Sequence, residues 1–200
     1  MKKLVIFAIA LLLPTLPSLG QTASHDSANF DGPAPLELTL AYSTVRANAP
    51  PGGCDCFWMQ GGKVEANAHL YRGWSGVAEL AGQHASNIDV AHNDLSLVSY
   101  LFGPRYSYDS SRRWTPFAQA LVGGVHGFDA FFPSQDESGT AADAFAMSAG
   151  GGLNLDLNRH FAVRVFQADY FFTHLPNNQG DRQNNLRLSA GITLRFPQRR

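Results

Sequence analysis

The sequence has little cysteine and no surplus of charge of either sign. Its 200 residues include only 2 Cys, and 15 Lys and Arg stand against 16 Asp and Glu, which gives a formal net charge of -1. Two cysteines are too few for a disulfide framework, and a chain without a basic patch lacks the electrostatic footprint of a nucleic-acid-binding protein. We therefore expect no nucleic-acid partner, and we expect a chain of this length to form one domain around its own core.

Only one long hydrophobic run is present, from Leu4 to Leu13. It follows Lys2 and Lys3 and is followed by prolines and small residues, which is the order found in a secretory signal peptide. The run is too short for a transmembrane helix, which needs about 20 apolar residues. We predict a signal peptide over residues 1–20, with cleavage as late as residue 23 as the alternative, and a linker over residues 21–35. Without a second run, the exported chain is expected to be a soluble protein or a membrane β-barrel.

Apolar and polar residues alternate along several segments, most clearly from Leu186 to Phe196. That segment is long enough for a tilted membrane-spanning strand, which needs about 9 to 11 residues, whereas ordinary strands average about 5 to 6. Similar or weaker alternation predicts seven further strands, in residues 36–43, 63–70, 74–83, 98–106, 114–126, 152–157 and 161–173. The fold class is therefore predicted to be all-β: an eight-stranded antiparallel up-and-down transmembrane β-barrel over residues 36–196, with a C-terminal extension over residues 197–200.

The connections between these predicted strands alternate in length. Residues 47–58, 84–94, 127–143 and 174–185 form long connections, whereas residues 72–73, 109–113 and 158–159 form short ones. Outer-membrane barrels have short periplasmic turns and longer external loops. The alternation therefore predicts a membrane barrel with its long loops outside the cell.

Several stretches resemble a known family. The segment from Asn185 to Phe196 ends on an aromatic residue and resembles the β-signal of outer-membrane barrels. YLFGPRYSY (residues 100–108), TPFAQALVGG (115–124) and FAVRVFQADYFFTHL (161–175) look like segments of OmpA-type and opacity-type eight-stranded barrels. The resemblance is to the membrane barrel alone, without the peptidoglycan-binding domain that many members carry, and Pro197 to Arg200 extend past the family's usual aromatic end.

This resemblance implies a place in the bacterial outer membrane. It implies outer-membrane lipid and the barrel-assembly machinery as partners, the latter through the C-terminal strand ending at Phe196. It also implies a structural or surface-interaction role, adhesin-like, with an unidentified extracellular ligand for the loops. Fold alone does not fix such a role.

The lumen of an eight-stranded barrel is just wide enough to be filled by side chains. Buried charges must pair, so inward charges predict a network of carboxylates and guanidinium groups that plugs the lumen, with a gated or proton-conducting pore as the alternative. Nine charged residues fall on polar faces or can be placed there: Glu37, Lys63, Glu65, Glu79, Arg105, Asp156, Arg164, Arg187 and Arg195.

Strict alternation fails in the segment 161–173. If Arg164 points inward, Gln167 and Asp169 point toward lipid, where charge is unfavourable at mid-depth. A bulge near Phe166, or a position at the rim for Asp169, resolves the conflict. The sequence pattern is consistent with either.

Aromatic residues gather near the ends of the predicted strands and are expected to form interfacial girdles, although in a soluble barrel they would be core residues. They are Tyr42, Trp58, Trp74, Tyr106, Tyr108, Trp114, Tyr170, Phe171 and Phe172.

Cys54 and Cys56 lie close together in a predicted loop. We expect a local disulfide or two free thiols there, because two thiolates without a nearby histidine do not make up a metal site. The histidines on or beside predicted loops, His84, His92, His126 and His174, lack the spacing and carboxylate partners of a metal site. No metal or cofactor is expected.

Two rival functions follow from the sequence. A lipid-modifying enzyme at the barrel rim could use Ser86, His84 and Asp89, or His174 with Ser189, but no triad is specified and no Gly-x-Ser-x-Gly motif is present, so we do not predict an enzyme. A soluble exported carrier of an apolar ligand would turn its apolar face inward, whereas a membrane barrel turns it outward.

Overall fold

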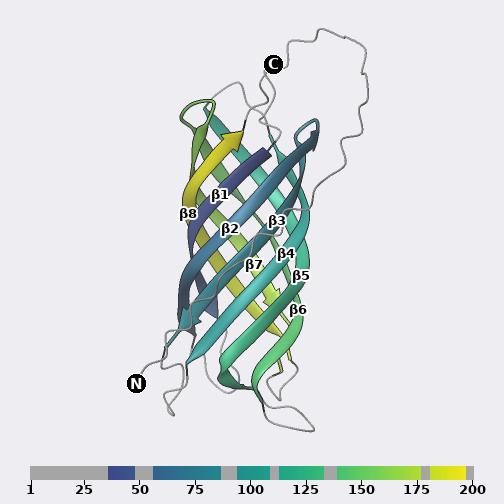
Figure 1. The fold of residues 1–200 in the computed structure, drawn as a ribbon, viewed down its shortest axis with the longest axis vertical. Helices are drawn as coiled ribbons and strands as arrows, with labels where there is room; N and C mark the ends of the chain where they lie inside the picture. The colour runs from purple at the N-terminus through teal and green to yellow at the C-terminus, as the bar shows by residue number, and fades with distance from the viewer. Residues whose placement is uncertain are drawn as a thin grey trace, which may run out of the picture. The chain divides into compact units, whose positions relative to one another are not determined.

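Eight antiparallel strands close into one barrel in the computed structural model, which describes residues 36–47, 56–86, 94–108, 113–132, 139–176 and 181–196. Neighbouring strands pair in sequence order, and the first strand pairs with the last (Figure 1). The predicted eight-stranded antiparallel up-and-down barrel is therefore confirmed. The strands are β1 (Leu36–Ala47), β2 (Phe57–Tyr71), β3 (Trp74–Ala85), β4 (Leu95–Ser107), β5 (Trp114–Phe132), β6 (Gly139–Asp156), β7 (Phe161–Thr173) and β8 (Gln183–Phe196).

We call the two ends of the barrel the turn end and the loop end. At the turn end, uppermost in Figure 1, β1 begins, β8 ends and β2 turns into β3 through Arg72 and Gly73. Both residues have positive φ, 44° and 84°, as a type I′ hairpin turn requires, and glycine adopts this conformation without a steric penalty. At the loop end, β1 ends and β2 begins.

The hairpin of β5 and β6 corrects the prediction of a long loop over residues 127–143. β5 continues to Phe132 and β6 starts at Gly139, with Phe128 opposite Ala141 in the ladder. The predicted segment 152–157 was likewise too short, since β6 has 18 residues. Runs of alanine and glycine, such as Ala149 to Gly152, show no apolar alternation although their backbone pairs normally.

The hairpin of β5 and β6 extends past the neighbouring strands at the loop end. β5 passes Phe128, the last residue opposite β4, and β6 starts well before Ala146, the first residue opposite β7 (Figure 1). Among the described residues, the strand ladder of its outer part therefore runs between β5 and β6.

The barrel is apolar outside, and its inward face carries many polar and charged residues. Along β1, Glu37 and Thr39 are buried in the lumen while Leu40 and Tyr42 are exposed on the outer face. Every strand exposes at least one large apolar side chain, and many of the fully buried side chains are charged. This polarity is the reverse of a soluble protein and contradicts the soluble-carrier alternative, which needs an apolar interior.

A β-bulge in β7 resolves the conflict in the sequence pattern. Val165 and Phe166 both point outward, and the ladders to β6 and β8 shift register at this place. The extra residue restores the inward direction of Gln167 and Asp169, so that Asp169 is 0% exposed rather than at the rim.

The predicted aromatic girdles are largely exposed to the outside. Trp74 and Tyr106 face each other across β3 and β4 at the turn end, with ring centroids 5.2 Å apart. Trp58, Trp114, Tyr42, Tyr108 and Tyr170 are also exposed. Phe171 is an exception, because its position after the bulge turns it into the lumen, where it is 1% exposed. In the described part of the chain, no helix is long and apolar enough to cross a membrane.

Candidate functional site

In the described part of the chain, ten charged side chains in the lumen are joined by ion pairs. All nine predicted lumen residues lie on the inward face, and Asp169 joins them. The five basic residues are Lys63, Arg105, Arg164, Arg187 and Arg195, and the five acidic ones are Glu37, Glu65, Glu79, Asp156 and Asp169. Their formal charges cancel, which meets the requirement that buried charge be paired.

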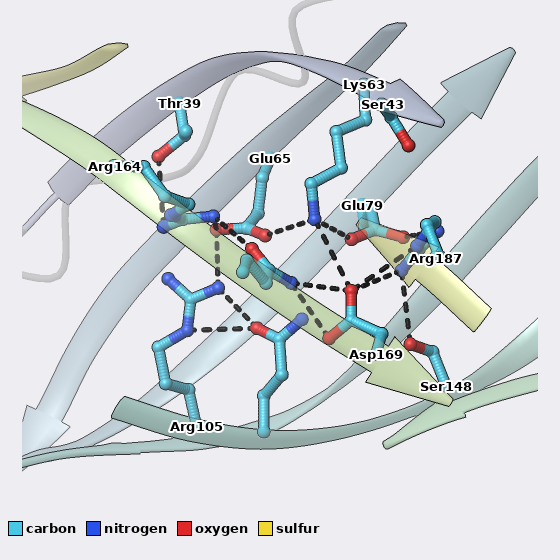
Figure 2. Close-up of polar contacts among 12 residues, drawn as sticks. Thr39, Ser43, Lys63, Glu65, Glu79, Arg105, Ser148, Arg164, Asp169 and Arg187 are labelled. Atoms are coloured by element: carbon cyan, nitrogen blue, oxygen red, sulfur yellow. Dashed lines mark hydrogen bonds and ion pairs between the residues drawn. The ribbon is translucent and has the colours of Figure 1, made fainter. Parts of the chain in front are cut away.

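One centre of the network is Glu65 on β2. Its Oε1 lies 2.8 Å from Nη1 of Arg164 on β7 and also accepts a hydrogen bond from Nη2 of Arg105 on β4 (Figure 2). Both guanidinium groups lie against the ring of Phe117, with Cζ atoms 4.3 Å and 4.7 Å from its centroid. A carboxylate and an aromatic face thus hold two like charges together in the lumen.

A second centre is formed by Glu79 and Asp169. Glu79 lies 2.9 Å from Nζ of Lys63 and 2.7 Å from Nη1 of Arg187. Arg187 also lies 3.2 Å from Asp169 (Figure 2). Gln167 connects the two centres, because its amide nitrogen donates to Asp169 at 2.8 Å and its carbonyl accepts from Arg164 at 2.9 Å.

At the turn end, polar pairs join β1 to β8 where the barrel closes. Glu37 and Arg195 are register partners, with Oε1 and Nε 2.7 Å apart. Thr39 and Thr193 are also partners, and their hydroxyls are 2.9 Å apart. Arg195 additionally lies 2.8 Å from Asp156, so the closing seam is joined to β6.

The polar network fills one half of the lumen, not all of it as predicted. Towards the loop end, the inward side chains form an apolar cluster that includes Val45, Met59, Leu121, Val125 and Phe171. The predicted strands 36–43 and 63–70 end before Val45 and begin after Met59, so these two residues were not predicted to be inward residues. Most of the inward side chains of both halves are almost fully buried.

Several polar lumen residues were not among the predicted ones. They belong to the network through hydrogen bonds to its charged members: Thr39, Asn67, Gln119, Ser148, Asn154 and Gln167. Thr39, Asn67 and Asn154 each lie two residues from a predicted charge on the same face, which is the signal that could have found them.

The cysteines, histidines and serines singled out from the sequence are only partly described by the structure. Cys56 and His84 are described, whereas Cys54, Asp89 and His92 lie outside the described residues, so the disulfide stays a prediction. His174 follows the end of β7, but Ser189 is buried on the inward face in the middle of β8, so this pair is not brought together.

His84 is hydrogen-bonded to Ser86. Both residues belong to the set of Ser86, His84 and Asp89 that the sequence suggested for an enzyme. No group of three or more His, Cys, Asp or Glu able to hold a metal ion occurs among the described residues.

Comparisons with known proteins reveal similarity at the level of structure. No protein-family model and no curated protein matches the sequence. Neisserial surface protein A is similar with a TM-score of 0.62 and 12% identity, over 83% of this chain and 100% of that one. The outer membrane protein OprG from Pseudomonas aeruginosa gives 0.57 and 9% identity, over 83% and 97%.

The attachment invasion locus protein Ail of Yersinia pestis gives a TM-score of 0.51 and 17% identity, over 80% of this chain and 96% of that one. All three are small eight-stranded outer-membrane barrels. The chain therefore has the fold of this class of barrels, of which OmpA-type and opacity-type proteins are members.

Proposed function

We propose that the chain is an integral outer-membrane β-barrel with a closed lumen, which stabilises the envelope and presents its loop end to an extracellular ligand. The observation that carries the proposal is the inverted polarity of the barrel, with large apolar side chains outside every strand and ion pairs inside. Such a surface is suited to lipid and unsuited to water. The fold shared with small outer-membrane barrels supports the same compartment.

The proposed orientation places the turn end in the periplasm and the loop end outside the cell. Short turns face the periplasm in barrels of this kind, and the Arg72-Gly73 turn lies at the turn end. The proposed partners are outer-membrane lipid around the barrel and the assembly machinery at β8. The exposed residues Leu188, Ile192 and Phe196 of β8 support this second contact.

The lumen is proposed not to conduct. Charged residues cross it in one half and apolar residues fill the other, so an ion would have to displace both layers. The role is therefore placed at the surface rather than in transport.

The extended hairpin of β5 and β6 supports a surface role. It passes the ends of its neighbouring strands at the loop end and exposes Thr140, Ala141 and Asp143. Ail, a protein of similar fold, is by its name an attachment protein. The adhesin-like role of this chain is proposed by that analogy together with the projecting hairpin.

The membrane part of the proposal is tested by expressing the chain with its N-terminal segment and isolating the outer-membrane fraction. We expect recovery in that fraction and a change in gel mobility on boiling, because a folded barrel resists detergent. Planar bilayer recordings of the purified protein should show no conductance steps. Recovery as a soluble protein without a mobility shift would contradict membrane residence.

The surface role is tested with a variant in which residues 129–140 are replaced by Asn-Gly. This short turn joins Phe128 to its register partner Ala141 and leaves the rest of the barrel unchanged. Bacteria displaying the natural chain should bind to members of an array of glycans and matrix proteins, and bacteria displaying the trimmed variant should not. Equal binding by both, or binding by neither, would contradict a surface role for this hairpin.

A further inference from the structure

Four polar residues form a continuous hydrogen-bonded chain on the outer face at the loop end. His84 Nε2 lies 3.0 Å from Ser86 Oγ, and His84 Nδ1 lies 2.9 Å from Ser96 Oγ. Ser96 Oγ in turn lies 3.0 Å from Oδ2 of Asp129. β3, β4 and β5 are adjacent, with His84 opposite Ser96, so the sheet itself brings these residues together.

The carboxylate of Asp129 determines the direction of every hydrogen bond in this chain. A carboxylate only accepts, so the Ser96 hydroxyl donates to Asp129. In the neutral ring, Nδ1–H of His84 then donates to Ser96 Oγ, and Nε2 carries no proton. Nε2 therefore accepts a hydrogen bond from the Ser86 hydroxyl. This is the tautomer that a general base needs in order to activate a serine.

A shallow apolar groove lies on the lipid-facing surface over β1, β2 and β3. Its floor includes Gly62 and Gly82, which are register partners, and its walls include Leu40, Val64 and Leu80. Gly82 lies two residues before His84, on the same outward face of β3. One end of the groove thus lies two residues along β3 from His84, on the side toward the middle of the outer face.

Gln60 is placed to assist at the same position. It is the register partner of His84, so the two side chains share a face and lie side by side. The Tyr42 hydroxyl donates to its carbonyl Oε1. This contact occupies Oε1, so the amide NH2 is the donor that the Gln60 side chain offers on this face.

We propose that Ser86 and His84 are the nucleophile and general base of an esterase site whose substrates are ester-linked acyl chains of membrane lipids. Ser96 and Asp129 are positioning residues that hold the histidine in its tautomer. The groove over Gly62 and Gly82 receives the acyl chain. This activity is additional to the proposed surface role and needs only that the outer face of the barrel contact lipid.

The reaction proceeds by acyl transfer to Ser86. Its Oγ attacks the ester carbonyl carbon while His84 Nε2 takes the hydroxyl proton, and Gln60 donates to the oxyanion. The carbon–alkoxy bond then breaks, and His84 returns the proton to the leaving alcohol. Water attacks the acyl-serine, giving one proton to His84, and the released acid leaves as this proton returns to Ser86 Oγ.

The first test uses the folded full-length barrel in detergent micelles with p-nitrophenyl laurate and a fluorophosphonate probe. We expect ester hydrolysis, with the probe attached to Ser86 by peptide mass spectrometry. Ser86→Ala should abolish both, and His84→Asn should lower kcat at least 100-fold. Each variant should retain the boiling-dependent mobility shift, which separates loss of activity from loss of the fold.

The matched controls are Ser107→Ala and His126→Asn. Ser107 lies at the turn end, and His126 pairs with Asp143 on the outer face without a serine in that pair. Both variants should keep the activity of the natural chain. No hydrolysis by the natural chain, or hydrolysis that survives Ser86→Ala, would overturn the proposal.

The groove is tested by Gly82→Leu. A Cβ at this position meets no atom within 4 Å, so the side chain can fill the groove without moving the backbone. Hydrolysis of the laurate ester should fall at least 10-fold, whereas hydrolysis of p-nitrophenyl acetate should be unchanged. Equal effects on both esters would overturn the assignment of the groove to the acyl chain.

The positioning residues are tested by Ser96→Ala and Asp129→Asn. Either change removes a hydrogen bond that keeps the proton of His84 on Nδ1. We therefore expect kcat to fall about 10-fold with KM unchanged. The rate of fluorophosphonate labelling should fall in parallel. An effect on KM alone would overturn the positioning role.

The lipid source is identified by incubating the natural chain with phospholipid vesicles or with lipopolysaccharide micelles. Fatty acid release from one of them identifies that lipid as a substrate, and release from neither would overturn the assignment to membrane lipid.

Discussion

Nη1 of Arg164 on β7 lies 2.8 Å from Oε1 of Glu65 on β2, and both side chains are completely buried. β1 and β8 separate these strands in the barrel wall, so the pair spans the lumen rather than two neighbouring strands. The charges thus connect distant parts of the wall.

Replacing Glu65 by alanine should destabilise the barrel strongly. Arg105 and Arg164 would both lose their carboxylate in a buried site, which is expected to lower the free energy of unfolding by about 3–5 kcal/mol. Glu37→Ala is the matched control, because its partner Arg195 is partly exposed and the loss should be smaller. Urea unfolding in lipid vesicles, followed by tryptophan fluorescence, measures both. Equal losses would contradict the central role of Glu65.

Deleting both outward residues of the bulge, Val165 and Phe166, should prevent the barrel from assembling. Gln167 would then follow Arg164 directly, so alternation would turn Gln167 and Asp169 toward lipid, and Arg187 would lose one of its two carboxylate partners. The variant should therefore lack the boiling-dependent mobility shift. Deleting Phe166 alone restores a regular strand in which Gln167 and Asp169 still point inward, and this control should retain the shift. A double-deletion variant that assembles normally would show that the residue count at the bulge does not set the direction of these side chains.

A charge placed on the outer face should be tolerated only near its edges. Leu80 lies in the middle of β3, and Leu80→Arg should lower the free energy of unfolding in bilayers by about 2–4 kcal/mol. Leu36 is the first residue of β1, and Leu36→Arg should lower it by about 0–1 kcal/mol. If the two variants unfold at the same urea concentration, the outer face does not cross a bilayer in the proposed way.

Shortening Phe171 should weaken the apolar half of the lumen. The ring is buried in the apolar cluster and lies 5.0 Å from Cζ of Arg187, so Phe171→Ala should lower the free energy of unfolding by about 3–5 kcal/mol. Phe172 is the neighbouring residue on the outer face and only half-buried, and its alanine variant should lose less. The same urea titration compares them, and a greater loss for Phe172→Ala would contradict the packing described.

The sequence was sufficient to predict the barrel because alternation is a direct result of one face meeting lipid and the other the lumen. The strand number and nine of the inward charges follow from the period of two, which is clearest in residues 186–196. Asp169 does not, because the bulge in β7 interrupts the period. The ends of strands were harder to predict. The pairing of Ala142 and Gly127 depends on backbone hydrogen bonds, which leave no mark in the sequence when side chains are small.

The partners of the charges could not be predicted, because they depend on the stagger between strands. Glu65 contacts Arg105 on β4 and Arg164 on β7, and no spacing in the sequence relates these positions. The bulge at Val165 and Phe166 was recognised only as a conflict in the pattern. The chain from Ser86 to Asp129 was missed in part, because Ser96 and Asp129 join it through the sheet register.

The polar pairs between β1 and β8 favour one register of the last strand over the others. A slip of β8 by one residue exposes its charges to lipid, so the apolar pattern already excludes it. A slip by two residues preserves that pattern, but it places Glu37 opposite Thr193 or Pro197 instead of Arg195. Thr39 would then face Gly191 or Arg195. The observed register pairs Glu37 with Arg195 and Thr39 with Thr193, and neither register shifted by two residues does so. These pairs therefore select the register in which the barrel closes.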